Sequence, residues 1–147
     1  MNSSDVKRLL TRRCKEKFLG VFPCDRLPDK LPPRRPLLLV CNTDPHNKPG
    51  EHWITIFLGE NSNGEYFDSF GGDIPAIFCR FLDKYCATWL RSYKQTQSAL
   101  TKFCGHYCVF YCLFKCLDYT LDEILNCFTS DTALNDFMVH KFVCDNL

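Results

Sequence analysis

The chain has 147 residues, of which 46% are hydrophobic and 14% aromatic, so it can bury the core of one globular domain covering residues 1–147. Eighteen basic and 17 acidic residues give a formal net charge of +1, which gives little support to a nucleic-acid partner. No apolar run reaches the roughly 18 residues of a membrane-spanning helix and the N-terminus lacks a signal-peptide pattern, so we expect a soluble intracellular protein without a membrane partner.

Eleven cysteines, an odd number, are scattered without the compact spacing of a disulfide framework. Six of them fall inside apolar helical patterns, at Cys79, Cys86, Cys108, Cys112, Cys116 and Cys127. This distribution is typical of buried free thiols in a reducing compartment and argues against a secreted disulfide scaffold.

The first part of the chain predicts a helix followed by an irregular arm. Val6–Phe18 carries apolar residues at helical spacing, with Ser3 or Ser4 as the N-cap, and indicates an amphipathic helix. Leu19–Pro36 contains too many prolines for a helix or a central strand, so we expect an ordered loop or extended arm there.

Three strands are predicted next. The apolar run Leu37–Cys41 suits a buried strand, and Asn42–Gly50 has the prolines and glycine of a turn. His52–Leu58 and Glu65–Asp68 are predicted as the two arms of a hairpin whose turn, Glu60–Gly64, ends in an Asn-Gly pair that tolerates positive φ. We expect these strands to form a small antiparallel sheet.

The second half of the chain predicts mainly helices. Ile74–Trp89 has the apolar recurrence of a helix that lies against the sheet, and Arg91–Gln97 alternates like a short edge strand. Three more helices are expected, a central one at Phe103–Leu117 and two at Leu121–Phe128 and Ala133–Val143, the last two capped by Thr120 and by Asp131 or Thr132. The fold class is therefore α+β, with the small antiparallel sheet packed against the central helix.

A histidine and a carboxylate meet at one end of the predicted hairpin. His52 heads one strand and Asp68 ends the next, and antiparallel pairing brings these positions together. A carboxylate that holds an imidazole in one tautomer also stabilises the imidazolium that forms when a thiol is activated. Either residue alone is more often structural, so the hypothesis of a base with an orienting acid rests on their combination with a nucleophile.

Cys104 is the candidate nucleophile. It stands at the start of the central helix, where the macrodipole and unpaired N–H groups lower the pKa of a thiol. Its backbone N–H and the side-chain amide of Gln97 can both point at a developing oxyanion, and Gly105 leaves room for a substrate backbone. Gln95 competes with Gln97 for this role, and spacing alone does not separate them.

The central helix also carries cysteines at every fourth residue. Cys104, Cys108, Cys112 and Cys116 lie along one face, but four successive turns extend too far to converge on one tetrahedral zinc ion. We therefore predict no metal site and expect the last three to be core residues.

The remaining histidines are weaker candidates for the base. His106 follows Cys104 by two residues, and side chains with that spacing point in roughly opposite directions on a helix. We expect His106 to face solvent or substrate, and we expect His46 and His140 to be surface residues.

Several short motifs recur in a familiar order. They are Phe18-Leu19-Gly20, Asn42-Thr43, Gly50-Glu51-His52-Trp53, Tyr66-Phe67-Asp68-Ser69-Phe70-Gly71, and Gln97 seven residues before Cys104-Gly105. Over about residues 1–117 the chain resembles the adenovirus-type cysteine endopeptidases (adenain) and, more broadly, the clan that includes the SUMO-deconjugating proteases. The resemblance implies a papain-like cysteine protease architecture in permuted order.

The resemblance also implies roles for individual residues. His52 would be the general base, Asp68 its orienting acid and Cys104 the nucleophile, with Gln97 rather than Gln95 in the oxyanion hole. The adenovirus enzymes carry Glu at the acid position whereas the SUMO proteases use Asp, so the role survives the change.

Two further positions and several partners follow from the same resemblance. Trp53 would pack beside the site and, with Gly105, contact substrate. No cofactor is required, although the family suggests stimulation by DNA or by a viral peptide, and the short chain after Leu117 puts those surfaces in doubt. The resemblance implies a monomer from a virus or a Maverick-type mobile element, acting in the host nucleus or cytoplasm or in the virion.

The leading hypothesis is a cysteine endopeptidase that matures capsid precursors through a thioester intermediate. The nearest alternative removes ubiquitin or SUMO-like modifiers from conjugates. A different class of hypothesis is a catalytically silent binding module on the same fold, or a module stabilised by metal on the helical cysteines.

Overall fold

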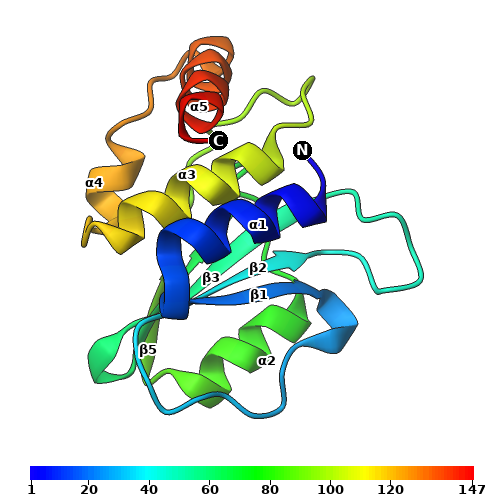
Figure 1. The fold of residues 1–147 in the computed structure, drawn as a ribbon, viewed down its shortest axis with the longest axis vertical. Coiled ribbons are helices and arrows are strands. Elements are labelled where there is room, and N and C mark those ends of the chain that lie inside the picture. The colour runs from blue at the N-terminus through cyan, green and yellow to red at the C-terminus, as the bar shows by residue number, and fades with distance from the viewer.

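A five-stranded mixed sheet runs through the middle of the molecule in the computed structural model, which describes residues 1–147 (Figure 1). The strands lie across the sheet in chain order: β1 (Phe18–Pro23), β2 (Leu37–Asn42), β3 (Trp53–Leu58), β4 (Asn63–Phe67) and β5 (Thr88–Arg91). β2, β3 and β4 pair antiparallel, whereas both edge strands pair parallel with their neighbours. The α+β class is confirmed, but the sheet is antiparallel only at its centre.

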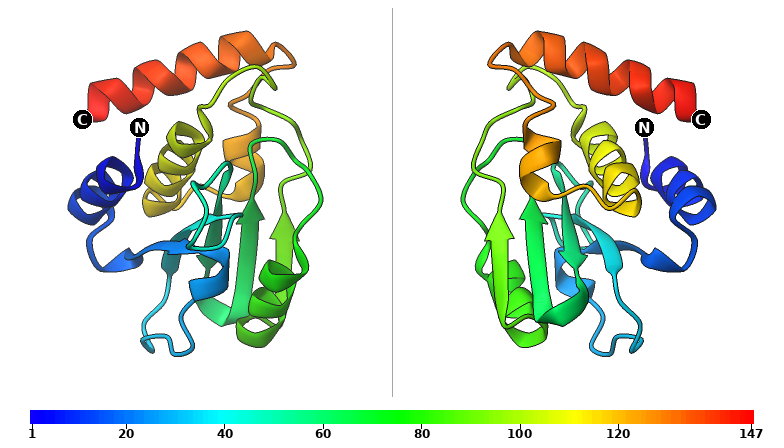
Figure 2. Two further views of the ribbon diagram at one scale, coloured as in Figure 1. Left: turned by 90° about the vertical axis from the view of Figure 1, so that its right-hand side faces the viewer. Right: turned by 90° about the vertical axis from the view of Figure 1, so that its left-hand side faces the viewer.

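Helices cover both faces of this sheet (Figure 2). α1 (Ser3–Cys14) and α3 (Cys104–Cys116) lie on one face, with α4 (Leu121–Leu125) and α5 (Thr132–Asn146) packed onto the same core. α2 (Ala76–Tyr85) lies on the other face with its own apolar cluster. The sheet therefore separates two cores, and α3 lies in the larger one.

The uninterrupted apolar run of β2 reflects burial of both faces of that strand. Leu38 and Val40 point into the core beneath α1 and α3, while Leu37, Leu39 and Cys41 point into the core beneath α2. Strands that are buried on both faces lose the apolar–polar alternation of half-exposed strands. The prediction of a buried strand here is confirmed.

The N-terminal expectations need correction. The first helix begins at Ser3, with Asn2 rather than a serine as its N-cap, and it ends at Cys14 because Lys15 adopts a φ of 54°. The following segment was expected to lack regular structure, yet Phe18–Pro23 forms edge strand β1. An edge strand needs hydrogen bonds on one side only, so Pro23 can end it without breaking the sheet.

The hairpin turn and the helix after it also differ from expectation. Asn61 and Ser62 take the positive φ angles of the turn, 61° and 58°, and the Asn-Gly pair instead opens β4. The helix stops at Tyr85, well before Trp89, which belongs to β5. Trp89 packs on the same core as α2 although it belongs to β5. Its position therefore extended the apolar helical spacing in the sequence beyond the residue at which the helix ends.

The segment expected as an edge strand at Arg91–Gln97 is irregular except for Arg91, the last residue of β5. The other helical predictions are confirmed within a few residues. Thr120 caps α4 by accepting a hydrogen bond from the Glu123 N–H, and Asp131, not Thr132, caps α5.

All eleven cysteines are free thiols, and six are buried: Cys14, Cys41, Cys86, Cys104, Cys108 and Cys112. None of the helices combines the length and the apolar character that crossing a bilayer requires. The two chain ends lie close together (Figures 1 and 2). Arg12, near the end of α1, donates hydrogen bonds to the carbonyl oxygens of Asn146 and Leu147 and so joins the C-terminus to α1.

Candidate active site

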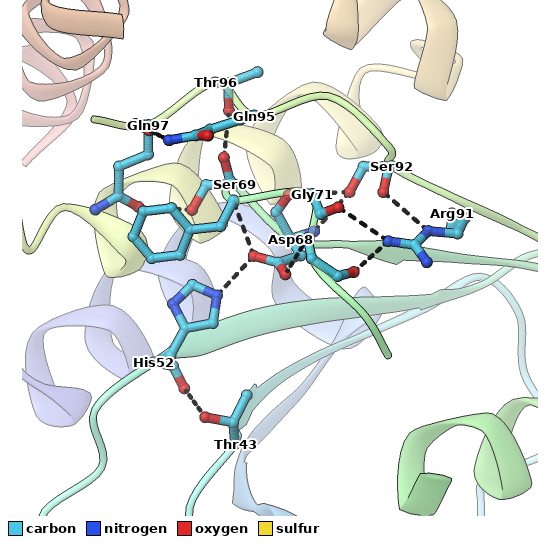
Figure 3. Close-up of polar contacts among 12 residues, drawn as sticks. Thr43, His52, Asp68, Ser69, Gly71, Arg91, Ser92, Gln95, Thr96 and Gln97 are labelled. Carbon is cyan, nitrogen blue, oxygen red and sulfur yellow. Dashed lines mark hydrogen bonds and ion pairs between the residues drawn. The ribbon is translucent and has the colours of Figure 1, made fainter. Parts of the chain in front are cut away.

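His52 and Asp68 meet at the end of the β3–β4 pair. Thr55 pairs with Phe67 in the antiparallel register, and continuing that register puts Asp68 opposite Ile54, so His52 is the diagonal neighbour of Asp68 on the same face. The His52 Nε2–H donates to Asp68 Oδ1 at 2.6 Å, and both side chains are largely buried. Nδ1 lies on the opposite side of the ring from Asp68 (Figure 3).

The Asp68 carboxylate is held by three donors. Oδ1 also accepts from the Phe70 N–H at 2.9 Å, and Oδ2 accepts from the Gly72 N–H at 3.2 Å. Burial opposes the charge, but hydrogen bonds from His52 and from these two backbone amides lower the pKa of Asp68 below its ordinary value. The acid is therefore ionised at neutral pH.

The turn after Asp68 is fixed by the last residue of β5 and the residue that follows it (Figure 3). The Ser92 hydroxyl accepts from the Asp68 N–H at 2.8 Å and donates to the Asp68 carbonyl oxygen at 3.1 Å. The Arg91 guanidinium donates to the carbonyl oxygens of Gly71 and Gly72. Sequence reasoning missed Arg91 and Ser92, since no pattern linked a serine and an arginine to a turn 19 to 24 residues upstream.

His52 is restrained by its backbone and its ring. Its carbonyl oxygen accepts from the Thr43 N–H at 2.9 Å, and its ring packs on Phe70 with centroids 4.8 Å apart. Burial lowers the pKa of His52, but hydrogen bonds to Asp68 and Cys104 outweigh it and raise the pKa to about 9. The imidazolium is the form present at neutral pH.

Cys104 is the first residue of α3, and only 9% of it is exposed. Burial opposes its ionisation, yet hydrogen bonds from His52 and from the backbone N–H groups of Trp53 and Gly105 lower the pKa of the thiol. His52 Nδ1 has no partner of strict hydrogen-bond geometry, as is common at catalytic sites without substrate. The lowered pKa of the thiol and the raised pKa of the imidazole both favour transfer of a proton from Cys104 to His52.

Gln97 is completely buried beside this site. Its Oε1 accepts from the Ser69 hydroxyl at 2.6 Å, and its Nε2 donates to the Thr101 carbonyl oxygen at 3.0 Å. Gln95 is exposed, and its side-chain amide donates to the Gln97 carbonyl oxygen. The structure thus places Gln97 in the interior, with one N–H of its side chain bonded to the Thr101 carbonyl oxygen. Gln95 lies at the surface, where its side chain supports the backbone of Gln97.

The loop that carries Gln97 is anchored on α5. Asn135 donates to the Thr96 carbonyl oxygen at 3.0 Å, and Asp136 accepts from the Ser98 N–H and the Thr101 hydroxyl. Both anchoring side chains are buried. These positions were not anticipated as part of the site, because nothing local distinguishes them from the other polar residues of that helix.

The two predicted substrate contacts flank His52 and Cys104. Trp53 is half-buried and borders a surface cleft of about 470 Å³ that Val21 and Asn42 also line. Gly105 is buried, and a Cβ there would lie 3.8 Å from Val6 and 3.9 Å from Trp53. The structure thus places Trp53 at a cleft and Gly105 within the packing of α3 on α1 and β3.

His106 does not face solvent, contrary to expectation. It is buried against Phe103 and His140, and burial, with the nearby N-terminal amino group and His140, lowers its pKa to about 4. His46 and His140 are exposed, as predicted. No three or more His, Cys, Asp or Glu side chains are placed to hold one metal ion.

No protein-family model matches the chain, and no curated protein matches it significantly. Solved structures do share its fold. Two crystal structures of the ASFV pS273R protease match, one with a TM-score of 0.70 and 18% identity over 95% of this chain, the other with 0.57 and 23% over 74%. ChlaDub1 from Chlamydia trachomatis matches with a TM-score of 0.52 and 17% identity over 76% of this chain.

These matches concern part of each longer protein. The chain spans 66% and 44% of the two ASFV protease chains and 58% of the ChlaDub1 chain. Because the identities are low, the likeness establishes the fold and leaves the chemistry to be argued from the residues present. The expectation of a protease-type fold is confirmed.

Replacing Gly71 by alanine should destabilise the turn that holds Asp68. Gly71 has a φ of 61°, and a Cβ there would lie 2.9 Å from the backbone of Tyr93 and Lys94. We expect Gly71→Ala to lower the free energy of unfolding by about 1–3 kcal/mol in urea titrations. Gly72→Ala is the matched control, since its Cβ would lie at an ordinary 3.6 Å from Asp68 Oδ2. Equal effects of the two changes would contradict this account.

The charge state of Cys104 should depend on His52. A lowered pKa means that the thiolate persists below the ordinary value and is lost only as the pH falls through the folded-state pKa. His52→Ala removes the hydrogen-bonding partner that offsets the effect of burial, so the pH midpoint of iodoacetamide alkylation at Cys104 should rise. Peptide mass mapping gives the rate at each cysteine, and exposed Cys127 is the internal control. An unchanged Cys104 profile would refute the ion pair.

Proposed function

We propose that this chain is a cysteine peptidase in which Cys104 is the nucleophile, His52 transfers protons and Asp68 orients the imidazole. One observation carries the proposal: His52 is bonded to a buried carboxylate on one side and coupled to a thiol at a helix start on the other. A histidine held only for structural reasons would not need both partners. The shared fold with the ASFV pS273R protease supports the same class of activity.

The steps follow from the charge states of the three groups. The Cys104 thiolate attacks the carbonyl carbon of a peptide or isopeptide bond, and the His52 imidazolium gives its proton to the departing amine. The neutral imidazole then takes a proton from water, which hydrolyses the thioester and releases the acid. Asp68 keeps Nε2 protonated throughout, so Nδ1 is the nitrogen that exchanges protons with substrate.

Two donors are suited to the oxyanion. The Cys104 N–H belongs to the first turn of α3, where Phe103 supplies no side-chain cap. The Gln97 carboxamide has two N–H bonds, and its weaker contact, 3.4 Å to the Thr101 hydroxyl, leaves one of them free to turn toward substrate. Every group invoked is part of the chain, so we propose that no bound cofactor is required.

We further propose that the substrates are protein precursors, cut after small residues such as glycine, as in the maturation of viral or virus-like capsids. The support is the resemblance of the His52, Asp68, Gln97 and Cys104 motifs to adenain, together with the shared fold of a protease from ASFV. Removal of a ubiquitin or SUMO-like modifier uses the same chemistry and is the competing function that the experiment must separate.

The test compares two kinds of substrate. Internally quenched peptides with glycine before the scissile bond report endopeptidase activity, and ubiquitin and SUMO carrying a C-terminal coumarin amide report deconjugation. We expect cleavage of the peptides, no release of coumarin, and loss of activity in Cys104→Ser, with Cys127→Ser as the matched control on an exposed thiol. Coumarin release without peptide cleavage would assign the chain to deconjugation. Activity that survives in Cys104→Ser would overturn the proposal.

Gln97 and Gln95 should differ in their effects on turnover. Loss of one oxyanion donor typically lowers kcat by about 10²- to 10³-fold, so we expect a fall of that order in Gln97→Ala. Gln95→Ala removes a brace on an exposed loop and should change kcat by less than about tenfold. Steady-state kinetics on the cleaved peptide distinguish the two. A larger loss in Gln95→Ala would exchange their roles.

A further inference from the structure

Two cysteines outside the proposed active site meet where α1 and α3 end. The two helices run side by side in the same direction and finish at the same end of the molecule (Figure 1). Cys14 is the last residue of α1, and Cys116 is the last residue of α3. Cys104 begins α3, roughly 18 Å of helix away, so it cannot reach either sulfur.

The Cys14 side chain lies against the last turn of α3. Cys14 Sγ lies 3.9 Å from the Cys112 carbonyl oxygen, which in an α-helix accepts the N–H of residue 116. A hydrogen bond between the two side chains is also the largest influence on the pKa of each thiol. In this reduced state, therefore, the thiols are already neighbours, and no rearrangement of the helices is needed to bring them together.

The environments of the two thiols differ. Cys116 is half-buried, and the hydrogen bond from Cys14, with the nearby Lys17 ammonium, lowers its pKa despite burial. Cys14 is 4% exposed, and the same hydrogen bond together with burial raises its pKa. Cys116 is therefore the more exposed and the more readily ionised of the two thiols. Low-pKa, accessible cysteines beside a second cysteine are the ones that oxidise reversibly.

We propose that hydrogen peroxide converts Cys14 and Cys116 into a reversible disulfide that ties the end of α1 to the end of α3. The inference does not depend on the proposed peptidase activity, since it uses none of the residues of that site. Cys112, the next sulfur along α3, does not compete because it is fully buried and protonated.

The reaction balances in two steps. The Cys116 thiolate attacks one oxygen of the peroxide, the O–O bond breaks, and Cys116 becomes a sulfenic acid while hydroxide leaves and is protonated to water. The Cys14 sulfur then attacks the Cys116 sulfur, the S–O bond breaks, and the departing hydroxide takes the Cys14 proton to form a second water. Two thiols are oxidised and one peroxide is reduced.

The disulfide would close a loop of about 100 residues, which restricts the unfolded chain strongly. Cys14 and Cys116 belong to helices that already pack on one core, so the native state needs little distortion to accept the bond. We therefore expect oxidation to raise the melting temperature by on the order of 5–15 °C.

The experiment uses the full chain carrying Cys104→Ser, which removes the other cysteine of lowered pKa. Reduced protein is freed of reductant, treated with equimolar hydrogen peroxide, blocked with N-ethylmaleimide and digested without reductant. We expect a peptide pair joined through Cys14 and Cys116, the loss of two hydrogen atoms from the intact mass, and the rise in melting temperature. All three should be reversed by dithiothreitol.

Two single variants test whether the crosslink depends on Cys116. Cys116→Ser changes a half-buried position at a helix end, and its melting temperature in reductant shows whether it is folded. In that variant the crosslink and the thermal gain should vanish, whereas Cys127→Ser should keep both. A crosslink to any other cysteine, a sulfinic acid at Cys116 with Cys14 still alkylated, or no change at either residue would overturn the proposal.

Discussion

The antiparallel pairing of β3 with β4 is the constraint on which the site depends. Ile54 and Ile56 of β3 and Tyr66 of β4 point into the core beneath α2, and a register slip of one residue would turn every one of these side chains to the opposite face. Packing in that core therefore fixes the strand register, and with it the positions of His52 just before β3 and Asp68 just after β4. The hydrogen bond between them could not do this itself, because desolvation offsets much of the attraction between partly buried charged groups.

A second restraint fixes the nucleophile relative to the sheet. α3 is buried around most of its circumference, with Tyr111 stacked on Phe67 of β4 and donating to the Glu65 carboxylate at 2.6 Å. Tyr107, one turn earlier, donates to Asp136 of α5 at 2.7 Å. Hydrogen bonds between buried side chains hold α3 in one position, since any shift of the helix would leave buried polar groups unpaired. Apolar packing and buried hydrogen bonds along α3 therefore fix the position of Cys104 relative to His52.

The sequence predicted the parts of this arrangement that local patterns encode. Strands β2 to β4, the central helix and the caps at Thr120 and Asp131 follow from apolar spacing and from hydrogen bonds within a few residues. The parallel edge strands could not be predicted in this way, because their pairing joins segments far apart in the chain and Pro23 reads locally as a breaker. The burial of His106 was missed for a similar reason, since it depends on α5 packing over the start of α3.

The cysteines of α3 show how neighbours, rather than spacing, decide the chemistry of a thiol. Cys108 and Cys112 occupy the middle of the helix, where burial raises the pKa of each thiol well above its ordinary value. At the two ends the burial is incomplete, and each end has a partner on another element: His52 beside Cys104 and Cys14 beside Cys116. A four-residue repeat on one helix face therefore contains two core thiols with raised pKa values and, at its ends, two thiols with lowered pKa values. The difference between the ends lies in the partner, because an imidazole can return a proton to a leaving group whereas a second thiol can only complete a disulfide.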